Sequence, residues 1–442
     1  MTERAVRGNS GAPRLGERGV LVLLLVLSAL PMVLLAVLRY RFALPSGDEP
    51  HYLIISQALV EHHSLDVQRI YDSAGYVAFH PTPIDPHTAP GPAGRPLPLH
   101  AVGGPVLWLV PFALAGRAGV MAFMIVISLA IVANVFRLAR VLGVERRTAF
   151  GVGLAFAVGT PILTYSSMSF VDPIGALVCV YALRLLHEER LRIRDLLLVS
   201  AGLGVLPWVH GRFLLFPPLF LAFLLLRLRR EGVPRGHVLA ALGPAVLLVL
   251  ALEAYNLAVW HTAALAPNQL HAGAVPFQHN PLPVLAGIAL DPDAGVLPHY
   301  PIFLLVVPGI LLATGRRWRG LHLHVAAAVL PYTLIVCSFP AWDGAWSPPA
   351  RFLAVVLPLL SGYVALALQR GPHPLVGLAA AAAAGYAGVR TMLAVFAPDD
   401  GFTAGAAERA TDLPAYLAWA VAALAVAVMA TRTLSAGPGR RA

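Results

Sequence analysis

The sequence predicts an all-α polytopic membrane protein. Of its 442 residues, 58% are apolar and only 12% are charged, and the mean hydropathy is +0.73. Soluble domains carry about 25% charged residues, so a soluble globular protein is excluded. A net charge of +10 raises the alternative of a nucleic-acid-binding protein, but the basic residues, all of them Arg, lie between long apolar runs. They are better explained as signals of membrane topology, and we expect no nucleic-acid partner.

Twelve apolar runs are candidates for membrane spans, which need about 20 mainly apolar residues. They lie at 19–39, 118–137, 149–166, 172–187, 195–210, 213–228, 237–259, 298–315, 321–338, 352–369, 374–394 and 413–431. The first run is too long for the core of a signal peptide and is followed by no convincing cleavage site, so we expect it to remain as a span. We find no internal repeat and no matching broken helices in the two halves, which inverted-repeat transporters tend to show.

The segment 97–116 decides the orientation. It is apolar, but Pro and Gly interrupt it, and we expect it to be a juxtamembrane helix that does not cross. The Arg-rich loops between the later spans then all face one side, which the positive-inside rule makes cytoplasmic. We therefore predict one transmembrane domain over residues 1–442 in the cell membrane, with no separate soluble domain. Both termini are cytoplasmic, and long outer loops lie at 41–117 and 260–297.

Most acidic residues and most His then lie on the outer side, and the inner loops contain no phosphate-binding P-loop or dinucleotide-binding glycine pattern. Asp48 and Glu49 follow the first span directly, in SGDEPHYL. Two adjacent carboxylates at a membrane exit are costly to desolvate unless they act as a base, bind a ligand or are paired. The alternative is that Asp48 caps a helix that starts at Pro50, with Glu49 in its first turn.

A further acid, Asp172, lies in the tight outer turn YSSMSFVDP. It also has an alternative explanation as a helix cap before Pro173.

Two of the Arg that run against the positive-inside trend are candidate ligands for an anion. Arg351 lies in the stretch FPAWDGAWSPPARFL, which also contains Trp342 and Asp343, and Arg212 follows His210 in WVHGRF. An Arg at the outer edge indicates an anionic partner such as a lipid phosphate. The alternatives are snorkelling for each Arg and a membrane-anchoring belt for the Trp residues.

The Pro-rich outer loop contains His80, His87 and His100. These residues allow a two-His plus carboxylate site for a divalent metal, although no short helical His spacing supports one. The sequence assigns no metal ligand, and a divalent metal stays an open alternative.

The Asp-Glu-x-x-Tyr pattern formed by Asp48, Glu49 and Tyr52 resembles the polyprenyl-phosphate-dependent glycosyltransferases of the GT-C superfamily, in the protein O-mannosyltransferase and lipid A aminoarabinose transferase branch. In that family the acidic pair opens a long outer loop with juxtamembrane helices, and a further acid often lies at the second outer turn, which Asp172 matches. The W-x-G-x-W-S-P-P-x-R-F stretch is similar to motifs of bacterial members. The layout agrees over nearly the whole chain, whereas the matching motifs are short.

The chain departs from the family pattern in three respects. Pro50 and His51 stand between the acids and Tyr52, no soluble C-terminal domain is expected, and Lys is absent. Phosphate contacts made by Lys in relatives must therefore come from Arg or His.

The resemblance implies a GT-C-like bundle of about 12 transmembrane helices with outer juxtamembrane helices. It also implies transfer of a sugar from a polyprenyl-phosphate donor to a glycan, lipid or protein acceptor at the outer membrane face. Asp48 is expected to be the general base, with Glu49 and Asp172 orienting the acceptor or assisting the base. The residues expected to bind substrate or lipid phosphate are Arg351, Arg212, His51, Tyr52, His210, Trp342 and Asp343. The rival functions are a secondary transporter or lipid flippase and a non-catalytic assembly subunit of the same fold.

Overall fold

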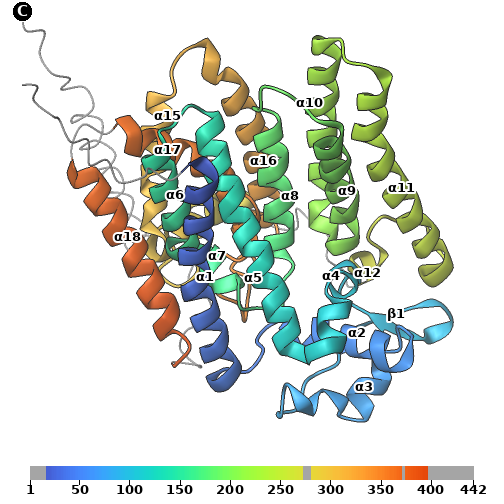
Figure 1. Ribbon diagram of the computed structural model, residues 1–442. Coiled ribbons are helices and arrows are strands. Elements are labelled where there is room, and N and C mark those ends of the chain that lie inside the picture. The colour runs from blue at the N-terminus through green and yellow to red at the C-terminus, as the bar shows by residue number, and fades with distance from the viewer. Residues whose placement is uncertain (1–15, 272–279, 371–373, 397–442) are drawn as a thin grey trace, which may run out of the picture.

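The computed structural model describes residues 16–271, 280–370 and 374–396, which form a helical bundle with one small sheet (Figure 1). The longer helices are α1 (Glu17–Phe42), α2 (Glu49–His62), α5 (Leu109–Val141), α6 (Arg146–Gly159), α8 (Asp172–Leu185), α9 (Ile193–Val209), α10 (Phe216–Glu231), α11 (Arg235–Trp260), α13 (Pro281–Leu290), α16 (Arg319–Cys337), α17 (Ser361–Arg370) and α18 (Pro374–Leu393). The shorter helices are α3 (Gln68–Asp72), α4 (Gly103–Leu107), α7 (Pro161–Tyr165), α12 (Pro267–His271), α14 (Val296–His299) and α15 (Val306–Leu312). The 3-10 helices are η1 (Gly75–Ala78), η2 (Pro92–Gly94), η3 (Gly211–Leu215), η4 (Pro301–Leu305), η5 (Arg316–Trp318), η6 (Phe352–Val355) and η7 (Leu357–Leu360). Strands β1 (Thr88–Pro90) and β2 (Pro96–Pro98) pair antiparallel.

The expected class of helical membrane protein is confirmed. Among the described residues, six helical segments are long and apolar enough to cross a membrane, namely Glu17–Phe42, Leu109–Val141, Gly211–Glu231, Arg235–Trp260, Arg316–Cys337 and Val376–Leu393. Large apolar side chains such as Leu30, Leu239 and Leu247 are 62–70% exposed on these helices, as expected for a surface that faces lipid. The count of about 12 spans stays a prediction, and the run 413–431 lies outside the described residues.

Three of the predicted spans are broken helices instead of continuous ones. The run 149–166 is divided into α6 and α7 at Thr160, whose extended backbone precedes Pro161. The run 298–315 becomes α14, η4 and α15, and 352–369 becomes η6, η7 and α17. A Pro is the first or second residue of α7, η4 and η7, and it has no N–H to continue the preceding helix. Non-helical backbone at membrane depth is tolerated where protein surrounds it.

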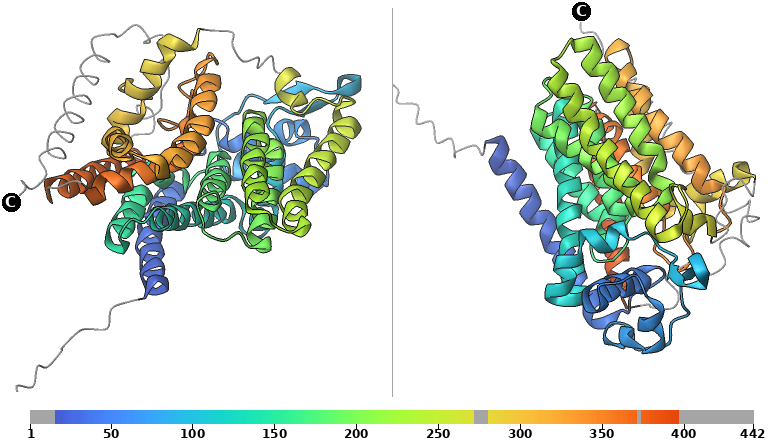
Figure 2. Two further views of the ribbon diagram at one scale, coloured as in Figure 1. Left: turned by 90° about the horizontal axis from the view of Figure 1, so that it is seen from above. Right: turned by 90° about the vertical axis from the view of Figure 1, so that its right-hand side faces the viewer.

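The residues 43–108, which we call the cap, gather at one end of the bundle and contain α2, α3, α4 and the sheet (Figures 1 and 2). The segment 97–116 was predicted to form one juxtamembrane helix, and the structure divides it. It contains part of β2, then α4, then the first turns of α5, which bend sharply at Ala115 and Gly116. The positive φ of 54° at Gly116 explains the bend, because residues with a side chain rarely adopt it.

Close contacts hold the cap on the bundle. The Trp108 indole donates a hydrogen bond of 3.0 Å to the Ser56 hydroxyl, which ties α2 to the start of α5. Gly103 of α4 lies so close to the backbone of Trp208 in α9 that an added Cβ would come within 2.4 Å of it. These contacts fix the cap against the start of α5 and the end of α9.

Candidate functional site

Two carboxylates and two guanidinium groups meet where the cap joins the bundle. Arg351 Nη2 donates to Asp48 Oδ2, and Arg351 Nε lies 3.8 Å from Asp172 Oδ2. Arg212 Nη2 donates to Asp172 Oδ1 at 2.5 Å. We call these four residues the carboxylate–arginine network. Asp172, Arg212 and Arg351 are buried, whereas the Asp48 side chain is 24% exposed, so the network opens to its surroundings at Asp48.

The helix-cap explanations of the two acids are wrong for this structure. Asp48 occupies the position before α2 and Asp172 is the first residue of α8, but neither helix receives a hydrogen bond from a capping side chain. Both carboxylates instead form ion pairs with Arg side chains from distant parts of the chain. Their position at the helix starts orients the two carboxylates toward the network. Helix capping does not explain why acids occur at these positions.

The charges of Asp48 and Arg351 stabilise one another. Burial alone would raise the pKa of Asp48, but the positive charge of Arg351, with smaller contributions from His100 and His51, holds that pKa well below its ordinary value. Burial lowers the pKa of Arg351, but the charges of Asp48 and Asp172 outweigh it and hold the pKa above its ordinary value. Both groups are therefore ionised at neutral pH.

Aromatic rings enclose the guanidinium groups. The Arg351 guanidinium carbon lies 4.2 Å from the centroid of the Phe170 ring, and that of Arg212 lies 4.5 Å from the Phe352 ring. Such contacts favour a desolvated cation and fix its plane. The network therefore presents two oriented guanidinium groups in a partly dry setting, which suits an anionic ligand.

Glu49 does not face the network. Its side chain is buried, and its Oε1 accepts a hydrogen bond of 2.8 Å from the Ser169 amide. Its Oε2 accepts one of 3.1 Å from the Ser46 amide and lies 3.5 Å from Arg39 Nη2. Because protein donors occupy both oxygens, Glu49 fastens α2 to α1 and to the turn before α8. Its expected role in orienting the acceptor or assisting the base stays a prediction.

Tyr52 and His210 lie close to the network. The Tyr52 hydroxyl is buried and has no hydrogen-bond partner among the described residues, and its ring meets that of Trp108 edge to face. His210 Nδ1 accepts from the Arg212 amide at 3.2 Å, and the Gln269 side-chain amide lies 2.8 Å from the same nitrogen. His210 therefore fixes the turn that carries Arg212.

Trp342 and Asp343 stabilise the loop that carries Arg351. An added Cβ at Gly287 of α13 would lie 2.8 Å from the Trp342 ring, so this ring packs directly on α13. Asp343 Oδ1 accepts a hydrogen bond of 3.1 Å from the Ala345 amide within the same loop. These contacts position the loop, whereas direct substrate contact by Trp342 and Asp343 stays a prediction.

A cluster of His residues in the cap adjoins Asp48. His87 Nδ1 lies 3.1 Å from His100 Nε2, and His100 Nε2 lies 4.0 Å from Asp48 Oδ1. His51, expected to bind substrate, belongs here: its ring stacks on His87 at a centroid distance of 3.6 Å. His80 lies outside the cluster and contacts Thr82.

The small sheet explains how the cluster forms, because Thr88 pairs with Pro98 and brings the two flanking His residues together. His51 Nδ1 shares a hydrogen bond of 2.7 Å with the Tyr71 hydroxyl. Neither the strand pairing nor the part played by Tyr71 has a signal that we recognised in the sequence.

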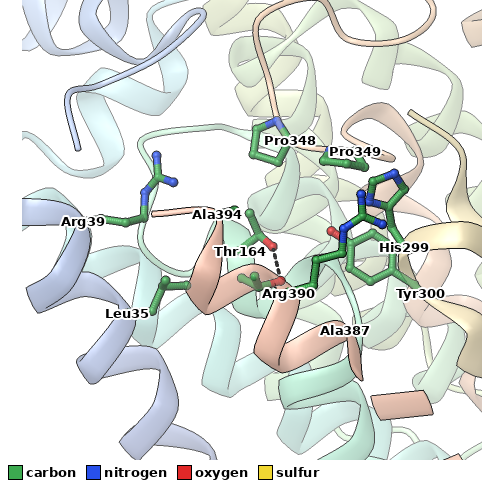
Figure 3. A pocket seen from close by; sticks show the side chains of 11 residues that line it. Leu35, Arg39, Thr164, His299, Tyr300, Pro348, Pro349, Ala387, Arg390 and Ala394 are labelled. Atoms are coloured by element: carbon green, nitrogen blue, oxygen red, sulfur yellow. Dashed lines mark hydrogen bonds between the residues drawn. The ribbon is translucent and has the colours of Figure 1, made fainter. Parts of the chain in front are cut away.

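A cavity of about 80 Å³ lies between α1 and α18 and shares Arg39 with the Glu49 contacts (Figure 3). Arg39 lines one wall, and Arg390, His299 and Tyr300 lie together at the other (Figure 3). No carboxylate is among the described residues that line it. A second group of basic side chains therefore lines this cavity.

Gly47 is required for the chain to enter α2. Its φ is +55°, and an added Cβ would lie 2.7 Å from the Trp346 carbonyl oxygen. We expect Gly47→Ala to lower the free energy of unfolding by at least about 1 kcal/mol more than Gly94→Ala does. Gly94 also has a positive φ of +74° but no atom near its missing Cβ, so it isolates the steric contribution. Denaturant unfolding in detergent measures both, and equal losses would show that the contact with Trp346 carries no cost.

The structure resembles that of a known protein, whereas comparisons of the sequence give no match. No family model matches the sequence, and no curated protein matches it. The structure is similar to that of ArnT from Cupriavidus metallidurans bound to undecaprenyl phosphate, with a TM-score of 0.53, 16% identity, and coverage of 93% of this chain and 76% of that chain. The apo oligosaccharyltransferase from Archaeoglobus fulgidus has a TM-score of 0.49 and 14% identity over 96% of this chain and 57% of that chain. The second similarity is too distant to carry an argument.

The likeness to ArnT concerns the fold alone at this identity, and it confirms the expected GT-C-like architecture. The chain is thus a helical membrane protein whose fold is similar to that of ArnT, with a carboxylate–arginine network where a loop-rich cap meets the bundle.

Proposed function

We propose that this protein is a membrane glycosyltransferase that moves a sugar from a polyprenyl-phosphate donor to a hydroxyl or amine of a cell-envelope glycan, lipid or protein. The observation that carries the proposal is the carboxylate–arginine network, in which a partly exposed carboxylate touches a buried, oriented guanidinium. The fold shared with ArnT, solved with undecaprenyl phosphate bound, supports the choice of donor. The distribution of Arg supports an extracytoplasmic site with both termini in the cytoplasm.

The guanidinium groups are suited to receive the leaving group. As the bond between the sugar carbon and the phosphate oxygen breaks, negative charge grows on the phosphate, and preoriented cations stabilise it. The Nε atoms of Arg351 and Arg212 are buried and make no hydrogen bond among the described residues, so each side chain retains a donor. A lipid phosphate would use these donors and draw Arg351 away from Asp48.

Asp48 then acts as the base. Its carboxylate takes the proton of the acceptor hydroxyl or amine while the acceptor atom attacks the sugar carbon, opposite the departing phosphate. The acceptor–carbon bond forms, the carbon–phosphate-oxygen bond breaks, and the proton stays on Asp48. The pairing of Asp48 with Arg351 links the two halves of the reaction, because the phosphate that binds the guanidinium also frees the carboxylate.

Asp172 and Glu49 are positioning residues in this mechanism. Asp172 is fully buried and contacts both Arg side chains, so it orients the phosphate-binding groups and not the acceptor. Glu49 sets the direction in which α2 begins. The rival transporter or flippase receives less support, since the two paired carboxylates lie at the starts of α2 and α8, where the cap joins the bundle.

The decisive experiment removes the charge of Arg351. We expect Arg351→Gln to weaken binding of a polyprenyl-phosphate sugar donor by about 10- to 100-fold, the equivalent of one charge-assisted hydrogen bond or more. Turnover falls as well, because the phosphate gains charge in the transition state. Donor affinity and sugar release are measured on protein reconstituted in nanodiscs, with mass spectrometry of the products from a panel of donors.

Arg390→Gln is the matched control, since Arg390 lines the separate cavity between α1 and α18. It should leave donor affinity within about twofold of the unmodified protein. If Arg351→Gln bound the donor as tightly as the unmodified protein does, Arg351 would not be a phosphate-binding residue.

A further inference from the structure

The groups that face Asp48 from the cap have the composition of a metal site. A carboxylate oxygen of Asp48, one ring nitrogen of His87 and one of His100 all lie within 4.8 Å of one another. We propose that Asp48, His87 and His100 bind a divalent first-row transition-metal ion of the Zn²⁺ type. This inference deepens the proposed function, because it places the ion at the acceptor side of the same site.

The spacing of the ligand atoms fits such an ion. Zn²⁺ binds imidazole nitrogen and carboxylate oxygen at about 2.0–2.2 Å, so tetrahedral ligand atoms lie about 3.3–3.5 Å apart. Two observed distances lie on either side of that value. His87 Nδ1 is 3.1 Å from His100 Nε2, and His100 Nε2 is 4.0 Å from Asp48 Oδ1. The ligand atoms of His87 and Asp48 lie within 4.8 Å of one another, so shifts on the order of 1 Å would complete the coordination.

Each of the two imidazoles has one nitrogen lone pair in its neutral form, which is the form that binds a metal ion. A direct hydrogen bond between the two rings is the competing explanation of their 3.1 Å contact, and the experiment below distinguishes the two.

Neighbouring residues hold the ligands in place. The His51 ring stacks on His87 at 3.6 Å with an interplanar angle of 14°. The Tyr71 hydroxyl contacts His51 Nδ1 at 2.7 Å and accepts a hydrogen bond of 3.3 Å from the His87 amide. The Leu99 amide donates to the His87 carbonyl at 3.1 Å, which fixes the two His residues across the hairpin. Such outer contacts are typical of metal sites.

The donor set also selects the type of ion. Imidazole favours Zn²⁺ and related transition metals over Mg²⁺ and Ca²⁺, which prefer oxygen ligands. Three protein ligands leave a coordination position open, and Asp48 is the exposed member of the network.

An acceptor hydroxyl at the open position would be acidified by the ion while Asp48 binds the ion through Oδ1. Its proton would pass to Asp48 Oδ2 once the donor phosphate has drawn Arg351 away, so the carboxylate serves as ligand and base at once.

The test uses the full-length protein in nanodiscs, purified without a His tag and stripped with a chelator. Co²⁺ is added, and bound metal is measured by mass spectrometry and by the visible absorption of Co²⁺. We expect one equivalent of Co²⁺ with a spectrum that Zn²⁺ abolishes by competition. His87→Ala and His100→Ala should each weaken binding by at least about 10-fold. His80→Ala is the matched control, because His80 lies in the same loop outside the cluster, and it should bind like the unmodified protein.

The proposal is overturned if the unmodified protein binds no stoichiometric Co²⁺, or if the His87 and His100 variants bind it as tightly as the control. Should either variant fail to fold, Co²⁺ protection of His87 and His100 from chemical modification in the unmodified protein decides the same question. If the protein binds Co²⁺ but transfers sugar from no donor, the proposed function is wrong and the metal site stands. If it transfers sugar but binds no Co²⁺, the metal site is wrong and the proposed function stands.

Discussion

Replacing Asp48 with Asn is expected to lower kcat for sugar transfer by about 10²- to 10⁴-fold, the usual contribution of a general base. The amide has nearly the same shape but cannot take the acceptor proton. Donor affinity should not fall, because the substitution removes the carboxylate that competes with the donor phosphate for Arg351. A kcat loss without a rise in the donor KM therefore distinguishes Asp48→Asn from Arg351→Gln, in which affinity falls too.

The measurement is steady-state transfer by protein in nanodiscs, with donor concentration varied at saturating acceptor. Asp72→Asn is the matched control, since Asp72 is an exposed acid of the same cap that accepts a hydrogen bond of 2.8 Å from Gln68. Its kcat should stay within about twofold of the unmodified value. Full turnover by the Asp48 variant would end the base assignment, whereas metal binding by that variant tests the ligand role separately.

The membrane class was predictable because apolar composition in long runs is a local property, and lipid imposes it on each spanning helix. Which runs are continuous was not predictable in the same way. The runs 149–166, 298–315 and 352–369 read as spans, yet each contains a break that surrounding protein tolerates. An apolar count does not distinguish a segment that faces lipid from one that faces other helices.

The members of the carboxylate–arginine network were each singled out in the sequence because they run against a trend. Asp48 and Asp172 are acids at span ends, and Arg212 and Arg351 are cations on the side that spans usually leave poor in Arg. That Asp48 pairs with Arg351, 303 positions later, depends on tertiary packing and has no local signal.

The contact between His87 and His100 in the cap was likewise not predictable from the sequence. His87 and His100 meet because a short hairpin pairs Thr88 with Pro98. The register of this hairpin cannot be predicted from a Pro-rich loop that lacks alternating apolar residues. The residue types allowed a metal site, and only the strand pairing selects these two over His80.

Removing the carboxylate of Asp172 is expected to destabilise the protein by about 3–5 kcal/mol. Asp172 is fully buried, and its loss leaves the Arg212 guanidinium, 8% exposed, without its 2.5 Å partner. An uncompensated buried charge costs this much, whereas a surface pair contributes only about 0–1 kcal/mol. Asp172→Leu should therefore lower the free energy of unfolding far more than Asp195→Leu, which removes one hydrogen bond from Tyr181 and an ion pair with Arg194, itself 75% exposed. Equilibrium unfolding in mixed detergent micelles compares the two.

The double variant Asp172→Leu/Arg212→Met separates stability from function. Replacing both members of a buried ion pair with apolar side chains of similar size is often neutral or stabilising, so the double variant should recover most of the stability lost by Asp172→Leu. Donor binding should not recover, because Arg212 no longer contributes a guanidinium and Arg351 has lost the carboxylate 3.8 Å from its Nε. If donor affinity returned together with stability, Asp172 and Arg212 would serve the fold alone, and the phosphate would depend on Arg351 without them.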